Sequence, residues 1–125
     1  MNYLTFKQKL FSRFKNSFLI SGLFSFFGKE LQPEKWVFIV GCYNSGTTLL
    51  AEIFEKHPQL AVLPDEGVML TNQLARPEDF GWRRMWCECE DQMQIDPSKA
   101  TKATRILKKH WSHFVKKNPK IVVEI

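Results

Sequence analysis

The segment 41–48 has the residue types and the spacing of a loop that binds phosphate. Gly41 and Gly46 match the glycines of G-x-x-x-x-G-K-[ST], whereas Thr47 stands at the lysine position and Thr48 at the hydroxyl position. Backbone amides and the open first turn of a helix attract an anion whatever the side chains are. The loop therefore predicts phosphate binding, and the missing lysine argues against ordinary hydrolysis of ATP or GTP.

Two predicted elements hold this loop in place. Residues 36–40 are an apolar run typical of a buried strand, and residues 46–57 form a helix that His57-Pro58 ends. Glycine lets the backbone between them approach a ligand closely, so we expect the phosphate over residues 44–48. Four apolar side chains share one face of the helix, which we expect to be its packing face: Leu49, Leu50, Ile53 and Phe54.

This strand, loop and helix resemble the 5′-phosphosulfate loop of sulfotransferases that use 3′-phosphoadenosine 5′-phosphosulfate (PAPS). The resemblance covers residues 35–70 and rests on the apolar strand, Ser-Gly-Thr-Thr, the helix, His-Pro and a following acidic loop. It implies an α/β fold with a parallel, P-loop-like sheet, and transfer of a sulfuryl group to a hydroxyl of a carbohydrate or small metabolite without a metal ion. The residues that it implies for the cofactor are Tyr43, Asn44, Ser45, Gly46, Thr47 and Thr48.

One position departs from the family pattern. Such enzymes usually carry Lys or Arg immediately before Ser-Gly-Thr-Thr, where the cation supports charge that develops on the leaving phosphate. Asn44 stands there in this chain. Asparagine donates hydrogen bonds but carries no charge, so part of the stabilisation must come from elsewhere in the molecule or be weaker.

The chemistry also needs a base, and the loop Pro64-Asp65-Glu66-Gly67 follows the helix at a suitable distance. The resemblance favours Glu66 as the general base and Asp65 as the second choice. The alternative is that both are solvated turn residues beside proline and glycine. Cytosolic members of the family tend to use a histidine instead, but His110 and His113 lie in a helical pattern that favours packed or solvated imidazoles.

Two other functions compete with sulfuryl transfer. A degenerate nucleotide kinase needs the missing lysine and an acidic strand end for magnesium, for which Glu124 is the available carboxylate. A non-catalytic fragment that binds phosphate or a membrane surface is the other alternative. A glycine turn that serves packing alone is the remaining explanation of the loop.

The second half of the chain predicts a long helix and a further strand. Asp96-Pro97 begins a helix that runs over 97–117, and 121–125 read as a strand parallel to the first, in a right-handed βαβ unit. The predicted buried stripe of the helix is Ala100, Ala103, Leu107, Trp111 and Phe114. Its basic opposite face favours a solvated surface, and we expect no nucleic-acid partner because no motif supports one.

Residues 1–33 differ in composition from residues 34–125, so we divide the chain into an N-terminal basic amphipathic segment and a sulfotransferase-like domain. Residues 1–28 suit a helix packed on that domain, or a helix lying at a membrane surface. Their uncharged run is too short to span a bilayer. With 125 residues, the chain is expected to be the N-terminal part of such a catalytic domain, without the residues that hold the 3′-phosphate.

The cysteines and tryptophans give weaker indications. Three cysteines without a matching zinc set are expected to be reduced thiols, which favours a cytoplasmic location. Trp82 and Trp86 flank two arginines, a combination that suits gripping an acceptor such as a sugar. Their spacing of four equally suits a helix that covers the core, and packing is the favoured interpretation.

Overall fold

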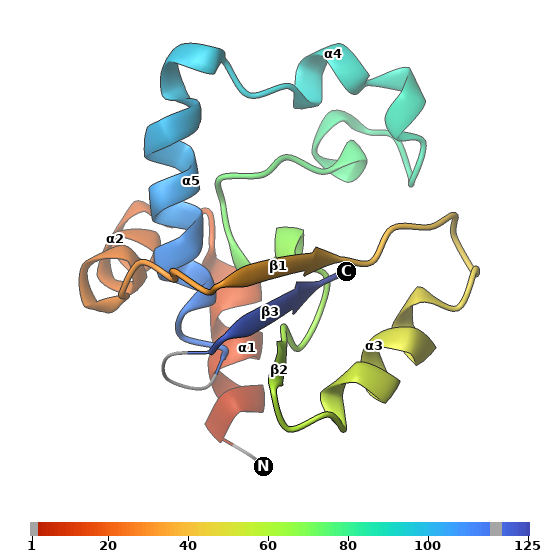
Figure 1. Cartoon of the computed structure of the whole chain (residues 1–125). Helices are drawn as coiled ribbons and strands as arrows, with labels where there is room; N and C mark the ends of the chain where they lie inside the picture. The colour runs from red at the N-terminus through yellow and green to blue at the C-terminus, as the bar shows by residue number, and fades with distance from the viewer. Residues whose placement is uncertain (1–2, 116–118) are drawn as a thin grey trace.

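The computed structural model describes residues 3–115 and 119–125 and contains a small parallel sheet with helices around it (Figure 1). Its strands within the described residues are β1 (Lys35–Phe38), β2 (Leu60–Val62) and β3 (Ile121–Glu124), in the order β1-β3-β2. Both pairings are parallel, with Val37 and Val62 each opposite Val123. The predicted α/β class and the parallel pairing of the first and last strands are confirmed.

The strand β2 is not predicted by the sequence pattern. It has three residues and follows directly after the turn at His57-Pro58, so it is too short to show a period of its own. It pairs with β3, which lies between the two earlier strands. This arrangement explains why residues 121–125 are almost wholly apolar, because a central strand is covered on both faces.

The helices are α1 (Tyr3–Phe14), α2 (Phe18–Phe27), α3 (Thr47–Glu55), α4 (Glu90–Met93) and α5 (Pro97–Trp111). Short 3₁₀ turns are η1 (Gly67–Leu70), η2 (Pro77–Phe80) and η3 (Trp86–Glu88). The N-cap of α5 is as predicted, because Asp96 Oδ1 accepts a hydrogen bond from Ser98 N at 2.9 Å. The helix ends at Trp111 rather than at 117, and residues 116–118 lie outside the described part of the chain.

The main core lies where α1, α2 and α5 meet one face of the sheet. Its buried members are Phe11, Leu31, Leu63, Leu70, Trp111, Phe114 and Val122. Trp111 and Phe114 belong to the stripe that the sequence predicts for this helix and the turn after it. Phe11 is fully buried, so α1 packs on the domain rather than standing apart from it.

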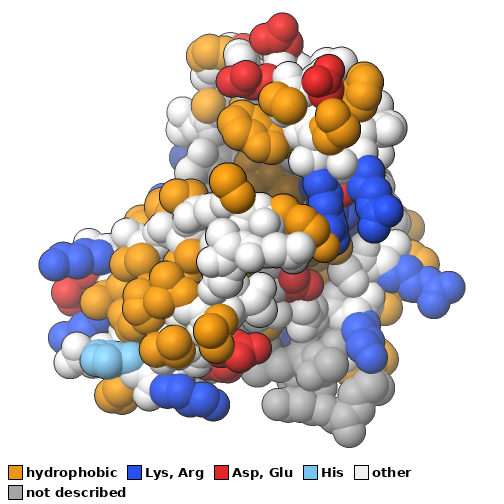
Figure 2. All heavy atoms as spheres, turned by 90° about the vertical axis from the view of Figure 1, so that its right-hand side faces the viewer, with side chains coloured by type: hydrophobic (Ala, Val, Ile, Leu, Met, Phe, Trp, Pro, Cys, Tyr) orange, Lys and Arg blue, Asp and Glu red, His pale blue; other side chains and the backbone are white. Residues whose placement is uncertain are grey.

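A second cluster fills the space between α3 and the sheet, but not with the predicted helix face. Ala51 is buried against Ile39 and Val123, and Phe54 packs beside them. Leu49 is 63% exposed, and Leu50 and Ile53 are also exposed. The predicted packing face is therefore wrong for these three residues, because the path of the loop rotates α3 so that only the 51/54 side meets the strands. Figure 2 shows apolar side chains gathered over this part of the surface.

Candidate functional site

The loop between β1 and α3 has the backbone shape of an anion cradle. Asn44 and Gly46 both have left-handed backbone, with φ of 61° and 90°, and Thr47 then opens the right-handed helix. A hydrogen bond of 3.0 Å from Ser45 N to Cys42 O closes the turn. Left-handed Gly46 followed by right-handed Thr47 turns successive amides towards one side, a backbone arrangement that binds anions.

The two glycines of the loop are needed for different structural reasons. A Cβ at Gly41 would collide with Ser45 Oγ and lie 2.9 Å from Thr47 Cγ2, so the loop folds back onto this residue. Gly46 has open space around it, but its φ favours glycine. Gly46 is also the N-cap of α3 and offers no side chain, so the first-turn amides have no side-chain cap.

The predicted base lies on the loop before η1. The side chain of Glu66 is exposed, whereas Asp65 is engaged on both oxygens. Asp65 Oδ1 accepts from Glu66 N at 2.9 Å, and Asp65 Oδ2 accepts from Gln8 Nε2 at 3.2 Å. Of the two acids, Glu66 is therefore the one with a carboxylate open to a substrate.

The tertiary structure adds a second carboxylate, that of Glu124 at the end of the central strand β3. Its Oε1 accepts a hydrogen bond from Gly67 N at 3.1 Å. Burial raises the pKa of Glu124 and the charge of Glu66 raises it further, while the hydrogen bond from Gly67 opposes the shift. A Cβ at Gly67 would lie 2.7 Å from Glu124 Oε1 and 2.6 Å from Trp111 Cζ2, so this contact needs glycine.

Sequence reasoning considered Glu124 only as a magnesium ligand of a kinase. The sequence signal for Glu124 is a single carboxylate at the end of an apolar strand. In parallel sheets, ligands bind beyond the carboxyl ends of the strands. Ile39 N donates to Glu124 O at 2.8 Å, so the chain enters the 41–46 loop at the carboxyl end of the sheet, where Glu124 lies. Gly67 N donates to the side chain of the same Glu124, so the turn that carries Glu66 and the start of the loop both lie at the carboxyl end of β3.

An arginine reaches the loop from a distant part of the chain. The guanidinium carbon of Arg84 lies 3.8 Å from the centre of the Tyr43 ring, which is a cation–π contact. Trp86 beside it is 60% exposed and Trp82 is 40% exposed. The favoured prediction that these tryptophans cover the core is thus wrong, because they lie in an irregular segment and η3 rather than on a helix. Figure 2 shows Lys and Arg side chains gathered on this side of the molecule.

The two histidines proposed as alternative bases are structural. His110 is fully buried, with Nδ1 3.1 Å from Thr71 Oγ1 and Nε2 3.2 Å from Ser21 O. His113 Nε2 lies 2.7 Å from Phe24 O. Burial lowers the pKa of both imidazoles, against the smaller effect of these backbone contacts. The expectation of packed imidazoles is confirmed for His110.

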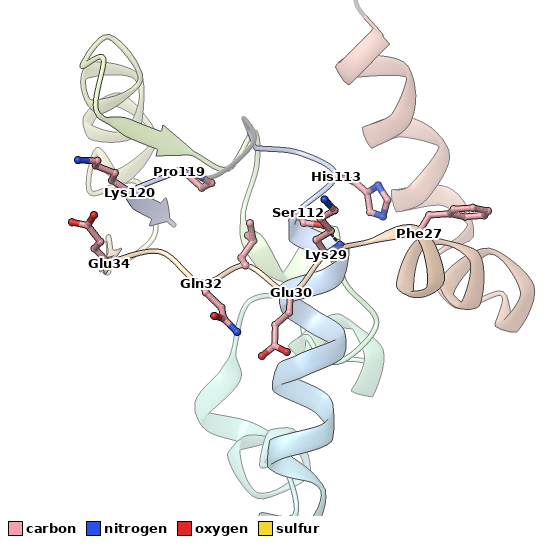
Figure 3. Close-up of a pocket in the computed structure, with 10 residues that line it drawn as sticks. Phe27, Lys29, Glu30, Gln32, Glu34, Ser112, His113, Pro119 and Lys120 are labelled. Atoms are coloured by element: carbon pink, nitrogen blue, oxygen red, sulfur yellow. Dashed lines mark hydrogen bonds between the residues drawn. The ribbon is translucent and has the colours of Figure 1, made fainter.

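Two hollows in the described part of the surface lie away from the loop. The larger, of about 730 Å³, is lined by residues of the 27–34 segment, by Ser112 and His113 after α5, and by Pro119 and Lys120 before β3 (Figure 3). These residues precede β1 and β3, so the hollow is at the amino ends of the strands. Its lining includes His113, one of the alternative bases, but neither Glu66 nor the residues predicted for the cofactor.

The thiols and acids give no sign of a metal centre. Cys42 and Cys87 are exposed and Cys89 is buried, all as free thiols. Among the described residues, no group of three or more His, Cys, Asp or Glu is arranged to hold a metal ion. Across those same residues, every helix falls short of the length and apolarity needed to cross a bilayer.

Comparison with protein-family models, curated proteins and solved structures finds no significant match to this chain.

Proposed function

We propose that the chain binds PAPS at the 41–48 loop and transfers its sulfuryl group to an acceptor hydroxyl. The observation that carries the proposal is the pair of left-handed residues, Asn44 and Gly46, that opens an uncapped helix directly behind a parallel strand. A P-loop-like fold is part of the same proposal, supported by the order β1-β3-β2 with the loop between β1 and α3.

The mechanism follows from the groups at the carboxyl end of the sheet. The amides from Gly46 to Thr48 and the side chains from Asn44 to Thr48, with Tyr43 beside them, hold the 5′-phosphate. Glu66 takes the proton of the acceptor hydroxyl, whose oxygen attacks the sulfur in line. The bond between sulfur and the bridging oxygen breaks, and its electron pair leaves with the phosphate. Catalysis is then mainly positioning and charge stabilisation, and it requires no metal ion.

The acceptor is proposed to be a carbohydrate or a small metabolite. Exposed indole rings are good surfaces for the apolar face of a sugar, and Trp82 and Trp86 are exposed on the segment that reaches the loop. Arg83 lies between them and is also exposed, so it adds a partner for an anionic group on the acceptor.

The direct test is titration of the chain with the desulfated nucleotide, 3′-phosphoadenosine 5′-phosphate, followed by amide resonances. Shifts at Ser45 to Thr48 are expected because the amides from Gly46 to Thr48 form the cradle and the amide of Ser45 closes the same turn. Isotope transfer from labelled PAPS then measures turnover. Glu66→Gln should lower transfer by about a hundredfold to ten-thousandfold with nucleotide binding unchanged. Unmoved loop resonances in the folded chain would contradict the proposal.

The same experiments separate the two competing functions. Nucleotide binding without transfer in the unmodified chain indicates a non-catalytic phosphate-binding module, which the same backbone cradle supports. Hydrolysis of ATP by the purified chain indicates a degenerate kinase, in which Glu124 at the end of β3 is the magnesium ligand.

A second candidate function is contact with a membrane surface through residues 1–28. The outer face of α2 leaves Phe18 90% exposed and Phe26 80% exposed, with Leu19, Leu23 and Phe27 also exposed. No acidic residue precedes Glu30, so this apolar face lies in a basic segment that complements anionic lipid. The corresponding location is the cytoplasmic face of a membrane, to which the protein attaches peripherally.

Sedimentation with vesicles of phosphatidylserine and phosphatidylcholine tests this contact. The unmodified chain should sediment with the vesicles, and Phe26→Ala/Phe27→Ala should not. Leu49→Ala is the matched control, since Leu49 is an exposed apolar residue on α3. Equal sedimentation of the α2 variant and the control would rule out the contact.

A further inference from the structure

The 81–86 segment brings a positive charge to the loop whose expected cation is missing. Arg84 and Tyr43 are far apart in sequence, yet the guanidinium carbon lies 3.8 Å from the ring centre. Tyr43 immediately precedes Asn44, the position at which the sequence pattern expects Lys or Arg. The contact therefore brings a guanidinium to the residue next to the neutral position.

The local geometry of Arg84 points to a ligand rather than to a protein partner. Its backbone is left-handed, with φ of 60°, which is uncommon for a residue other than glycine and concentrates at binding sites. In the part of the chain that the structure describes, none of the ion pairs involves Arg84. The described contact of the guanidinium is with the Tyr43 ring, which leaves its N–H groups available for oxygen acceptors.

We propose, building on the function above, that Arg84 supplies the cation that Asn44 lacks and binds the phosphate end of the sulfate donor. Its N–H groups donate to the 5′-phosphate oxygens held by the 46–48 amides. When the sulfur–oxygen bond breaks, the charge that moves onto the bridging oxygen is stabilised by Arg84. Tyr43 is the positioning residue that orients the guanidinium.

The first experiment removes the charge and then restores it at the other position. Arg84→Ala should weaken binding of 3′-phosphoadenosine 5′-phosphate by about tenfold or more, because it removes charge-assisted hydrogen bonds to phosphate. Adding Asn44→Lys to this variant should recover most of the lost affinity. Lys99→Ala is the control, an exposed cation on α5 that has no role in the proposed site, and should leave the affinity unchanged.

A second variant separates charge from packing. Arg84→Gln keeps a polar side chain with N–H donors but has no charge, so it should bind the nucleotide as weakly as Arg84→Ala. Retained affinity in Arg84→Gln, or failure of the added Asn44→Lys substitution to restore binding, would overturn the inference. Thermal melts of Arg84→Ala and Arg84→Gln should stay close to that of the unmodified chain because Arg84 is exposed. The added Asn44→Lys should lower the melting temperature, because Asn44 has left-handed backbone, which asparagine adopts more readily than lysine.

The outcomes also separate this inference from the proposed function. If the unmodified chain does not bind the nucleotide, the proposed function itself fails. If the unmodified chain binds and Arg84→Ala binds equally well, the function stands and the role of Arg84 is disproved.

Discussion

Gly46 allows the loop after β1 to take its anion-binding shape. Its φ of 90° is unfavourable for any residue with a Cβ, although the space around it is open. Gly46→Ala should therefore lower the free energy of unfolding by about 1–2 kcal/mol through backbone strain alone. It should also weaken nucleotide binding, because relief of the strain turns the amides away from the ligand.

Urea unfolding measures this effect, and α2 offers a matched control. Gly22 also has open space around its would-be Cβ but lies within a helix. Gly22→Ala should stabilise the chain by about 0.5–1 kcal/mol, since alanine favours a helix interior over glycine. Stabilisation by both substitutions would show that residue 46 is not held in the left-handed conformation.

Also at the residue scale, Glu124 makes the stability of the folded chain depend on pH. Its pKa is raised in the folded chain above the ordinary value of 4.5, mainly by burial. The folded state therefore loses stability as the pH rises from about 4.5 through the raised pKa. Glu124→Gln lacks this charge and should gain stability over the unmodified chain at pH 8, with the difference shrinking towards pH 4. Thermal melts at both pH values check the sign, which a lowered pKa would reverse.

At the scale of elements, α5 contacts both helix α2 and the segment that follows η1. His110 on this helix contacts Ser21 of α2 on one side and Thr71, the residue after η1, on the other. One buried imidazole thus ties three segments that are distant in sequence. Such a buried polar group is stable only while its hydrogen bonds are kept and its ring is neutral.

The lowered pKa of His110 predicts acid sensitivity of this junction. Above pH 6.5, the ordinary histidine value, the ring is neutral in both folded and unfolded chains. As the pH falls below 6.5, the unfolded chain takes up a proton that the folded chain resists, so stability decreases. His110→Gln should show a shallower loss of stability between pH 7 and 5 in urea titrations. An unchanged slope in His110→Gln would contradict this assignment.

At the scale of the whole molecule, the N-terminal segment is part of the core. Phe11 of α1 packs with residues from the 63–70 segment, with Phe114 after α5 and with Val122 of β3. Its ring centre lies 4.6 Å from that of Phe24 on α2 and 6.0 Å from that of Phe114. Removal of the first helices should therefore destabilise the sheet as well.

Phe11→Ala tests this dependence with a single change. It should lower the free energy of unfolding by about 3–5 kcal/mol, because it removes a fully buried ring and leaves a cavity. Phe6→Ala is the control on the same helix, where the ring is half exposed, and should cost much less. Equal, small effects of both substitutions in chemical denaturation would mean that α1 is not part of the cooperative fold.

Local signals in the sequence predicted the elements around the loop. The spacing of Gly41 and Gly46 predicted the turn, Asp96-Pro97 predicted the start of α5, and the apolar run at 121–125 predicted a buried parallel strand. These features succeed because glycine conformation, helix capping and the burial of a central strand depend on a few neighbouring residues.

The tertiary structure alone decided which distant groups meet. The short strand β2, the contact of Arg84 with Tyr43 and the hydrogen bond from Gly67 to Glu124 join segments that no local pattern relates. The exposure of Leu49 on α3 likewise depends on how the helix is rotated against the sheet. Neighbours in the sequence favour a residue's backbone conformation. The residues that it contacts from distant segments depend on the packing of the whole chain.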